Sequence, residues 1–151
     1  MSVAPADPPA SSSVVLVRAR DSRLQGETVQ VALGARALLG RSKSCTWSLK
    51  RTLPYLQADE AARARLRLEP AFAAVSRRHC RISYLAPDLL EVENLSRNGT
   101  WVDGLRVERL LVTDLRARSH TLQLGREGPV LEVVAGTLPG ALAGVLPGAA
   151  S

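Results

Sequence analysis

Residues 76–104 read SRRHCRISYLAPDLLEVENLSRNGTWVDG, and their pattern decides the fold of this chain. Short runs of apolar, β-branched and aromatic residues occupy 81–84, 89–92 and 100–102. Pro-Asp, Asn-Gly and Asp-Gly pairs separate or follow these runs, and such pairs are typical of tight turns. Several short strands with turn signals between them indicate a β-sandwich or a barrel.

The same texture continues on both sides of this stretch. Further short apolar segments lie at 14–20, 28–33, 37–39, 46–49, 120–124 and 130–134. We therefore expect an all-β fold, a sandwich of two mostly antiparallel sheets that spans residues 14–135. Residues 1–13, rich in Ala, Pro and Ser, are expected to form a disordered leader. Residues 136–151 hold mainly Gly, Ala, Pro and Leu and are expected to form a flexible tail.

One segment departs from the strand pattern. Residues 57–66 read QADEAARARL, in which strong helix formers carry acids early and Arg late. That order complements a helix dipole. We therefore expect a short helix within an insertion of about residues 50–72 in one long loop. Because insertions in loops cost little stability, we expect this one to be inert.

Charge points to a class of partner. The chain has 151 residues, a formal net charge of +6 and a sequence pI of about 10.3. Such a balance favours anionic partners, namely phosphopeptides, nucleic acid or an acidic surface. Lys43 and Lys50 are the only lysines, so nearly all of the positive charge is Arg. The planar guanidinium presents a fork of donors that suits phosphate.

Several classes of protein require features that this sequence lacks. No apolar stretch approaches the roughly 18 residues of a membrane span, and residues 1–13, with no basic region and no apolar run, are not expected to be a signal peptide. With two cysteines we expect an intracellular protein with free thiols. The two Cys and two His are scattered, so we expect no metal and no cofactor. Kinase motifs are absent, and we expect no catalysis.

Three motifs lie between the expected strands. Gly40-Arg41 ends an apolar run, Ser76-Arg77-Arg78-His79 opens a strand, and Asn98-Gly99-Thr100 precedes another. Each motif is common alone. Their order and placement together resemble the forkhead-associated (FHA) family, whose recognition loops carry Gly-Arg, Ser-x-x-His and Asn-Gly-Thr. The resemblance covers about residues 14–135. It is closest to the FHA domains of DNA-damage checkpoint kinases, on residues 40–52.

The resemblance implies an FHA-type β-sandwich that binds phosphothreonine-containing proteins. The resemblance implies that Arg41, Ser76 and Arg77 bind the phosphate. It also implies that Asn98 and Arg97 hold the peptide backbone. The residues implied to shape these loops are Gly40, His79, Gly99 and Thr100. The chemistry is independently sensible, because Arg forks and hydroxyl donors match the acceptor oxygens of a phosphate.

The resemblance also bears on selectivity. In some FHA domains an Arg two places before the motif serine favours an acidic residue third after the phosphothreonine. Ala74 stands at that place here, among apolar neighbours, and offers no cation. Burial of apolar surface is favourable, so we expect Leu, Ile or Val at that peptide position.

Two other functions stay open beside a role in signalling or the DNA-damage response. The charge favours a basic nucleic-acid-binding domain, although aromatic residues make up only 3% and leave few stacking platforms. The chain could also be the non-catalytic N-terminal fragment of a checkpoint-type kinase. If the checkpoint resemblance holds, the protein is expected in the nucleus. The sequence indicates no oligomeric state.

Overall fold

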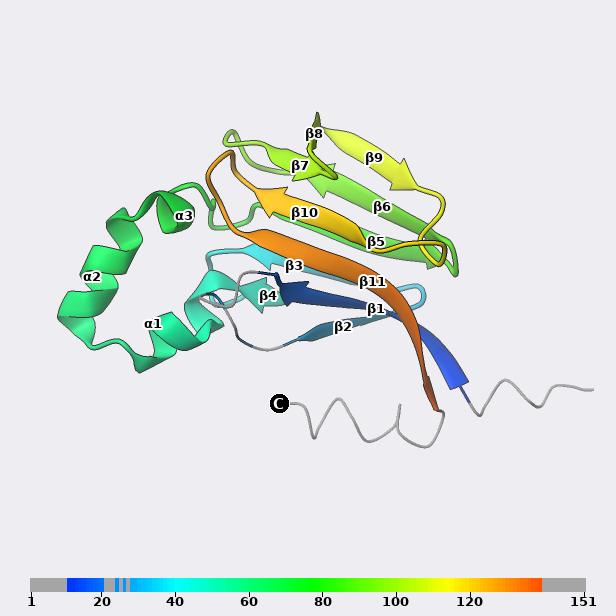
Figure 1. The fold of residues 1–151 in the computed structure, drawn as a ribbon, viewed down its shortest axis with the longest axis horizontal. Coiled ribbons are helices and arrows are strands. Elements are labelled where there is room, and N and C mark those ends of the chain that lie inside the picture. Colours follow the sequence, from blue (N-terminus) through cyan, green and yellow to red (C-terminus); the bar gives the residue numbers. More distant parts are fainter. Residues whose placement is uncertain (1–10, 21–23, 25, 27, 140–151) are drawn as a thin grey trace, which may run out of the picture.

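Figure 1 shows a computed structural model of the chain, which describes residues 11–20, 24, 26 and 28–139. In chain order the strands are β1 (Ser11–Ala19), β2 (Val29–Ala32), β3 (Arg36–Gly40), β4 (Trp47–Ser48), β5 (Cys80–Ala86), β6 (Leu89–Asn94), β7 (Thr100–Val102), β8 (Leu105–Val107), β9 (Arg109–Val112), β10 (His120–Leu124) and β11 (Val130–Pro139).

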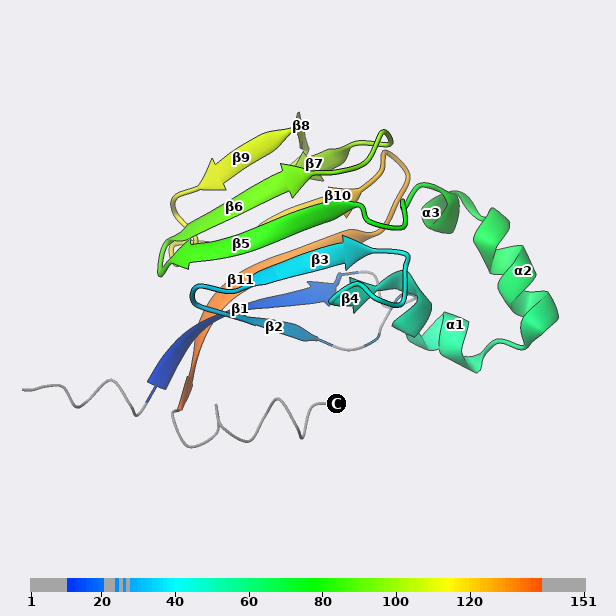
Figure 2. The same ribbon diagram turned by 180° about the vertical axis from the view of Figure 1, so that it is seen from behind.

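The strands form two sheets that face each other. One sheet has the order β2-β1-β11-β10-β7-β8, and the other has the order β4-β3-β5-β6-β9. Figures 1 and 2 show them as two layers seen from opposite sides. The paired strands run antiparallel, apart from β3 and β4, which pair in parallel. The predicted β-sandwich of two mostly antiparallel sheets is confirmed.

The sandwich is longer than predicted at both ends of the chain. β1 and β11 pair along their whole lengths, from Ser11 opposite Pro139 to Ala19 opposite Leu131. Residues 11–13 therefore belong to a strand and not to the predicted leader, and residues 136–139 belong to a strand and not to the predicted tail. Residues 11–13 pair with residues 137–139, so each segment supplies the pairing partner of the other. The rest of the predicted leader and tail lies outside the described residues.

The core lies between the two sheets. In β10 the side chains of His120, Leu122 and Leu124 are buried while the two between them are half-buried, as expected where one face of a strand meets a core. The largest side chains with almost no exposure are Trp47, Tyr84, Phe72, Leu39, Leu49, Ile82, Leu90, Leu115, Leu122, Leu124 and Leu131. A continuous core of this kind holds the loops at both ends of the sandwich in place.

A chain of short helices forms the insertion between β4 and β5. The 3₁₀ turn η3 (Leu49–Arg51) is followed by α1 (Leu53–Gln57), α2 (Glu60–Leu68) and α3 (Pro70–Ala73). They arch outward from one end of the sandwich (Figures 1 and 2). None of the helices in the described part of the chain has the length and apolar character that a membrane crossing requires. The predicted helical insertion is present, with more helices than the one expected.

The predicted helix over residues 57–66 corresponds to α2, which begins and ends later. The start is set by Asp59, whose Oδ1 accepts a hydrogen bond of 2.8 Å from the backbone N–H of Ala62. A side-chain cap of this kind satisfies one of the free N–H groups of the first turn. Residue 57 instead ends α1, so two helices meet where the sequence indicated one.

Two edge strands were not predicted. β8 pairs with β7, and β9 pairs with β6 at the border of the second sheet. Both segments carry exposed residues, among them Leu105 at 72% and Leu111 at 52% exposure. Edge strands hold few core residues, so the alternation that marks a strand in sequence is weak there.

Candidate anion-binding site

The motif loops lie at the end of the sandwich from which the helices arch. The β3–β4 loop, the segment between α3 and β5, the β6–β7 loop and the β10–β11 loop all reach this end (Figures 1 and 2). Residues far apart in sequence thereby come together on a rigid sheet pair, which is the usual placement of binding residues.

The first two motifs lie side by side. The backbone N–H of Arg41 donates to the carbonyl of Ser76 at 2.9 Å, and that of Ser42 donates to the carbonyl of Arg77 at 3.1 Å. Gly40 permits this approach, because a Cβ there would overlap the Arg77 carbonyl and lie 3.0 Å from the His79 nitrogen. The predicted phosphate-binding residues Arg41, Ser76 and Arg77 are therefore neighbours through their backbones.

His79 connects the second motif to the third. Its side chain is fully buried. Its Nδ1 accepts from the Ser76 backbone N–H at 3.0 Å, so the ring proton lies on Nε2, which donates to the Gly99 carbonyl at 2.7 Å. Burial lowers the pKa of His79 and thereby favours the neutral ring, while the hydrogen bond to the Gly99 carbonyl partly opposes this shift.

Ser96 is a member of the site that the sequence analysis missed. Its buried hydroxyl lies 2.5 Å from the Ser76 hydroxyl and accepts the backbone N–H of Asn98 at 3.0 Å. When Ser96 donates to Ser76, the Ser76 hydroxyl keeps its own proton for another acceptor. The signal in the sequence was the Asn94-x-Ser96 spacing, because Asn94 bonds to both backbone groups of Ser96.

The third motif forms a tight turn. Gly99 has a φ of +87°, which favours glycine, and a Cβ there would lie 2.9 Å from the Trp101 ring. Buried Thr100 donates its hydroxyl to Asn94 Oδ1 at 2.8 Å. Asn98 is exposed, and its amide nitrogen donates to the Ala74 carbonyl at 3.0 Å. This bond ties the turn to the segment that leads from the insertion to Ser76.

A basic pocket lies beside the first two motifs. Its lining residues are Arg41, Ser42, Lys43, Lys50, Arg67 and Arg77. No carboxylate lines it, and no ion pair within the described residues uses any of these five cations. Like charges gathered in a concave surface concentrate a positive potential and attract an anion. Of these cations, sequence analysis named Arg41 and Arg77 as site residues.

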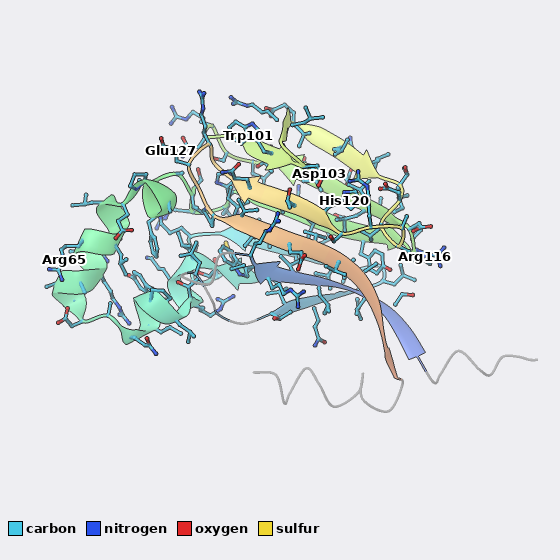
Figure 3. The ribbon with its side chains drawn as sticks, viewed as in Figure 1. Arg65, Trp101, Asp103, Arg116, His120 and Glu127 are labelled. Atoms are coloured by element: carbon cyan, nitrogen blue, oxygen red, sulfur yellow. The ribbon has the colours of Figure 1, made fainter. Side chains whose placement is uncertain are left out.

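Asn98 lines a different pocket, together with Pro70, Ala73, Ala74, Arg126 and Glu127. Figure 3 shows Glu127 in the β10–β11 loop, at the same end of the sandwich. Position 74 itself offers no cation, but Arg126, from a loop remote in sequence, lines the same pocket. Arg97 is exposed and makes no hydrogen bond or ion pair within the described residues.

Comparisons with known proteins agree with this architecture. The sequence model of the FHA domain family matches residues 37–125. The fold is similar to that of the FHA domain of the CT664 protein from Chlamydia trachomatis, at a TM-score of 0.52 and 16% identity over 80% of this chain and 96% of that one. It is also similar to the first FHA domain of Rv1747 from Mycobacterium tuberculosis, at a TM-score of 0.53 and 16% identity over 83% and 98%.

A third structure comes from a study of phosphothreonine-dependent FHA domain interactions. It matches at a TM-score of 0.50 and 21% identity, over 81% of this chain and 94% of that one. A comparison with curated proteins finds no significant match.

Proposed function

The chain belongs to the FHA domain family, and from that premise we propose that it binds phosphothreonine-containing peptides without catalysing a reaction. The observation that carries this proposal is the basic pocket, in which Arg41 and Arg77 lie together with no carboxylate in the lining. A phosphorylated threonine carries about −1.5 to −2 charges and three strong acceptor oxygens at pH 7. The relative studied for phosphothreonine-dependent interactions is consistent with this reading.

In this proposal three side chains recognise the phosphate. The guanidinium groups of Arg41 and Arg77 donate to its oxygens, and charge-assisted bonds of this kind are about twice as strong as neutral ones. The Ser76 hydroxyl donates a further bond when Ser96 is the donor of the hydrogen bond between the two hydroxyls. The backbone pairing between residues 41–42 and 76–77 sets these donors in place before the ligand arrives.

Asn98 and Arg97 are proposed to hold the peptide backbone. The amide nitrogen of Asn98 is already bonded to Ala74, while its amide oxygen makes no hydrogen bond within the described residues. That oxygen can accept a backbone N–H of an extended peptide, as an amide both donates and accepts. Arg97, exposed in the same turn, can reach a peptide carbonyl.

Gly40, His79, Gly99 and Thr100 are proposed to shape the loops without touching the ligand. His79 links two of these loops, because its ring bonds to the backbone of Ser76 on one side and of Gly99 on the other. Because loss of a buried donor or acceptor leaves its partner unsatisfied, this link is expected to be costly to break.

The cellular role is a proposal that rests on the motif resemblance. Residues 40–52 resemble FHA domains of checkpoint kinases, which favours partners phosphorylated in signalling or the DNA-damage response and a nuclear location. The domain is proposed to extend over the residues that pair in β1 and β11.

The test is a titration of the purified protein by calorimetry with one peptide in two forms, phosphorylated and unphosphorylated at a single threonine. We expect binding of the phosphorylated form alone. Arg41→Ala should weaken it by at least about tenfold, because a hydrogen bond to a charged group contributes about 1.5–3 kcal/mol.

A DNA duplex titrated in the same buffer distinguishes the alternative function. Tighter binding of the duplex than of any phosphopeptide in an oriented library would reject the proposal in favour of a nucleic-acid-binding domain. Wild-type affinity in a folded Arg41→Ala protein would reject the site.

A further inference from the structure

The helical insertion contributes a cation to the basic pocket. Arg67, in the last turn of α2, lines it beside Arg41 and Arg77. The expectation from the sequence was an inert insertion, and this position argues against it. Arg65 of the same helix does not line the pocket and stands on the outer side of α2 (Figure 3). The helix thus directs one of its arginines toward the pocket and another away from it.

The side chain of Arg67 is held in place by Tyr55 of α1. Its guanidinium donates to the Tyr55 hydroxyl at 3.2 Å. Tyr55 is 5% exposed, its ring stacks on Phe72 at 5.9 Å between centroids, and Arg63 lies 4.7 Å above the same ring. Arg63 also donates to the Tyr55 backbone carbonyl at 2.9 Å. A side chain that is already ordered loses less entropy when it binds a ligand.

The lysines of the pocket come from the β3–β4 loop and from η3, which are likewise held by hydrogen bonds. The Ser48 hydroxyl donates to the Arg41 carbonyl at 3.1 Å and accepts the Lys50 backbone N–H at 3.1 Å, which joins these two residues. Arg51 donates to the Lys43 carbonyl at 2.7 Å. Arg51 thereby supports the loop, and the side chains of Lys43 and Lys50 remain for the pocket.

The charge of the pocket exceeds that of one phosphate. Five cations line it, and Arg41 and Arg77 suffice to oppose about −2 charges. Lys43, Lys50 and Arg67 then face no anion. We propose that these three side chains form a second anion subsite, so that the preferred ligand is a phosphothreonine peptide with another anionic group close by. This inference rests on the proposed phosphopeptide function and names its ligand class more narrowly.

The second anion can be a second phosphate or a carboxylate, since the same cations suit both. The experiment uses calorimetry on a peptide with one phosphothreonine among alanines. A first panel adds one phosphoserine at each position within three residues of it, and a second panel adds one Glu at the same positions. In the wild-type protein we expect at least one added anion to tighten Kd by about tenfold, the effect of one charge-assisted bond.

Variants of the helical insertion test whether the tightening of Kd by the added anion depends on Arg67. Arg67→Ala should reduce the gain to about threefold or less, measured against the affinity of the same variant for the singly phosphorylated peptide. Arg65→Ala, the matched control on the same helix, should keep the gain. Tyr55→Phe retains the ring stacking and removes only the hydroxyl, so it should reduce the gain in part. If only phosphoserine tightens Kd, the second anion of the preferred ligand is a second phosphate. If Glu tightens Kd equally, the second anion is the carboxylate of an acidic residue.

The outcomes separate this inference from the function beneath it. If the singly phosphorylated peptide binds and no added anion improves its Kd, the second subsite is rejected while the proposed function stands. Equal losses in Arg67→Ala and Arg65→Ala would also reject it, because they would reflect net charge alone. If no phosphopeptide binds, the proposed function and the inference both fail.

Discussion

Arginines on the sheets and arginines at the basic pocket differ in their partners. On the sheet surfaces Arg18 pairs with Glu132, Arg81 with Glu93, and Arg109 with Glu91, and between two loops Arg116 pairs with Asp88. At the pocket, Arg41, Arg67 and Arg77 have no carboxylate partner within the described residues. The same residue type is therefore neutralised in one region and left for a ligand in the other.

Strand register explains two of these pairs. Arg18 stands opposite Glu132 in β1 and β11, and Arg81 stands opposite Glu93 in β5 and β6. Opposite charges at such positions stabilise a sheet modestly. The pocket lies where the strands have ended, and no register supplies a carboxylate there. A net charge of +6 consequently says little about binding until paired and unpaired cations are separated.

The largest expected effect comes from removing two cations of the basic pocket, compared with removing two paired cations elsewhere. The double variant Arg41→Ala/Arg77→Ala should weaken phosphopeptide binding by at least about 100-fold, because two bonds to a charged group are lost. The double variant Arg81→Ala/Arg116→Ala removes the same net charge from paired positions and should change Kd by less than about threefold. Similar losses in both proteins, measured by calorimetry, would break the comparison between the regions.

The next largest effect is expected on stability, at the buried His79 that bonds to Ser76 and Gly99. His79→Ala should lower the free energy of unfolding by about 2–4 kcal/mol, because it leaves a cavity and unsatisfied groups at Ser76 and Gly99. Arg109→Ala removes one exposed ion pair and should cost about 1 kcal/mol or less. Urea unfolding measures both values. A His79→Ala protein that unfolds like the wild type would show that the pocket does not depend on this buried side chain.

Acid should act on the same histidine. Burial lowers the pKa of His79 in the folded protein, so the unfolded chain binds a proton more readily. Stability contributed by the neutral ring is therefore complete above the ordinary value of 6.5 and is lost as the pH falls below it. One such group changes stability by at most about 1.4 kcal/mol per pH unit.

Urea unfolding at a series of pH values from 7.5 to 5 tests this dependence. The wild-type protein should lose stability across the range, and a folded His79→Gln variant should lose less. Identical pH profiles of the two proteins would assign the acid sensitivity to other groups.

The smallest effect concerns the second pocket. Ala73, Ala74 and Pro70 offer apolar surface there, while Arg126 and Glu127 line the pocket with one charge of each sign. We keep the prediction of an aliphatic residue third after the phosphothreonine, with a preference for Leu over Glu of about fourfold, the worth of one buried methylene. An oriented peptide library that selects Glu, and loses that selection in Arg126→Ala, would show that Arg126 decides specificity instead.

Much of the sandwich was readable from sequence because its strands alternate against a core. The run at 120–124 is an example, with Leu122 and Leu124 buried on one face. β8 and β9 escaped prediction because edge strands with exposed residues lack that alternation. The extra strand length at residues 11–13 escaped because Ser residues carry no β signal, and pairing with the end of β11 decides their conformation.

Of the candidate site, the turn residues were predictable and the contacts were not. Asn98-Gly99 marks a turn in any context, and Gly99 does adopt a positive φ. The role of Ser96 depends on the approach of a hydroxyl twenty residues earlier in the chain, at Ser76. No local pattern encodes such a distance.

The sequence by itself determined a two-sheet sandwich and the order of three loops at its ends, since strand alternation and turn chemistry act over a few residues. Only the tertiary structure decided which cations meet. Arg67 lines the pocket while its guanidinium bonds to the Tyr55 hydroxyl, and the Tyr55 ring stacks on Phe72, so that residues of three different helices meet there. Arg126 reaches the second pocket because the β10–β11 loop lies beside Ala74. Contacts of this kind follow from how the core closes, and the local sequence around each arginine does not carry them.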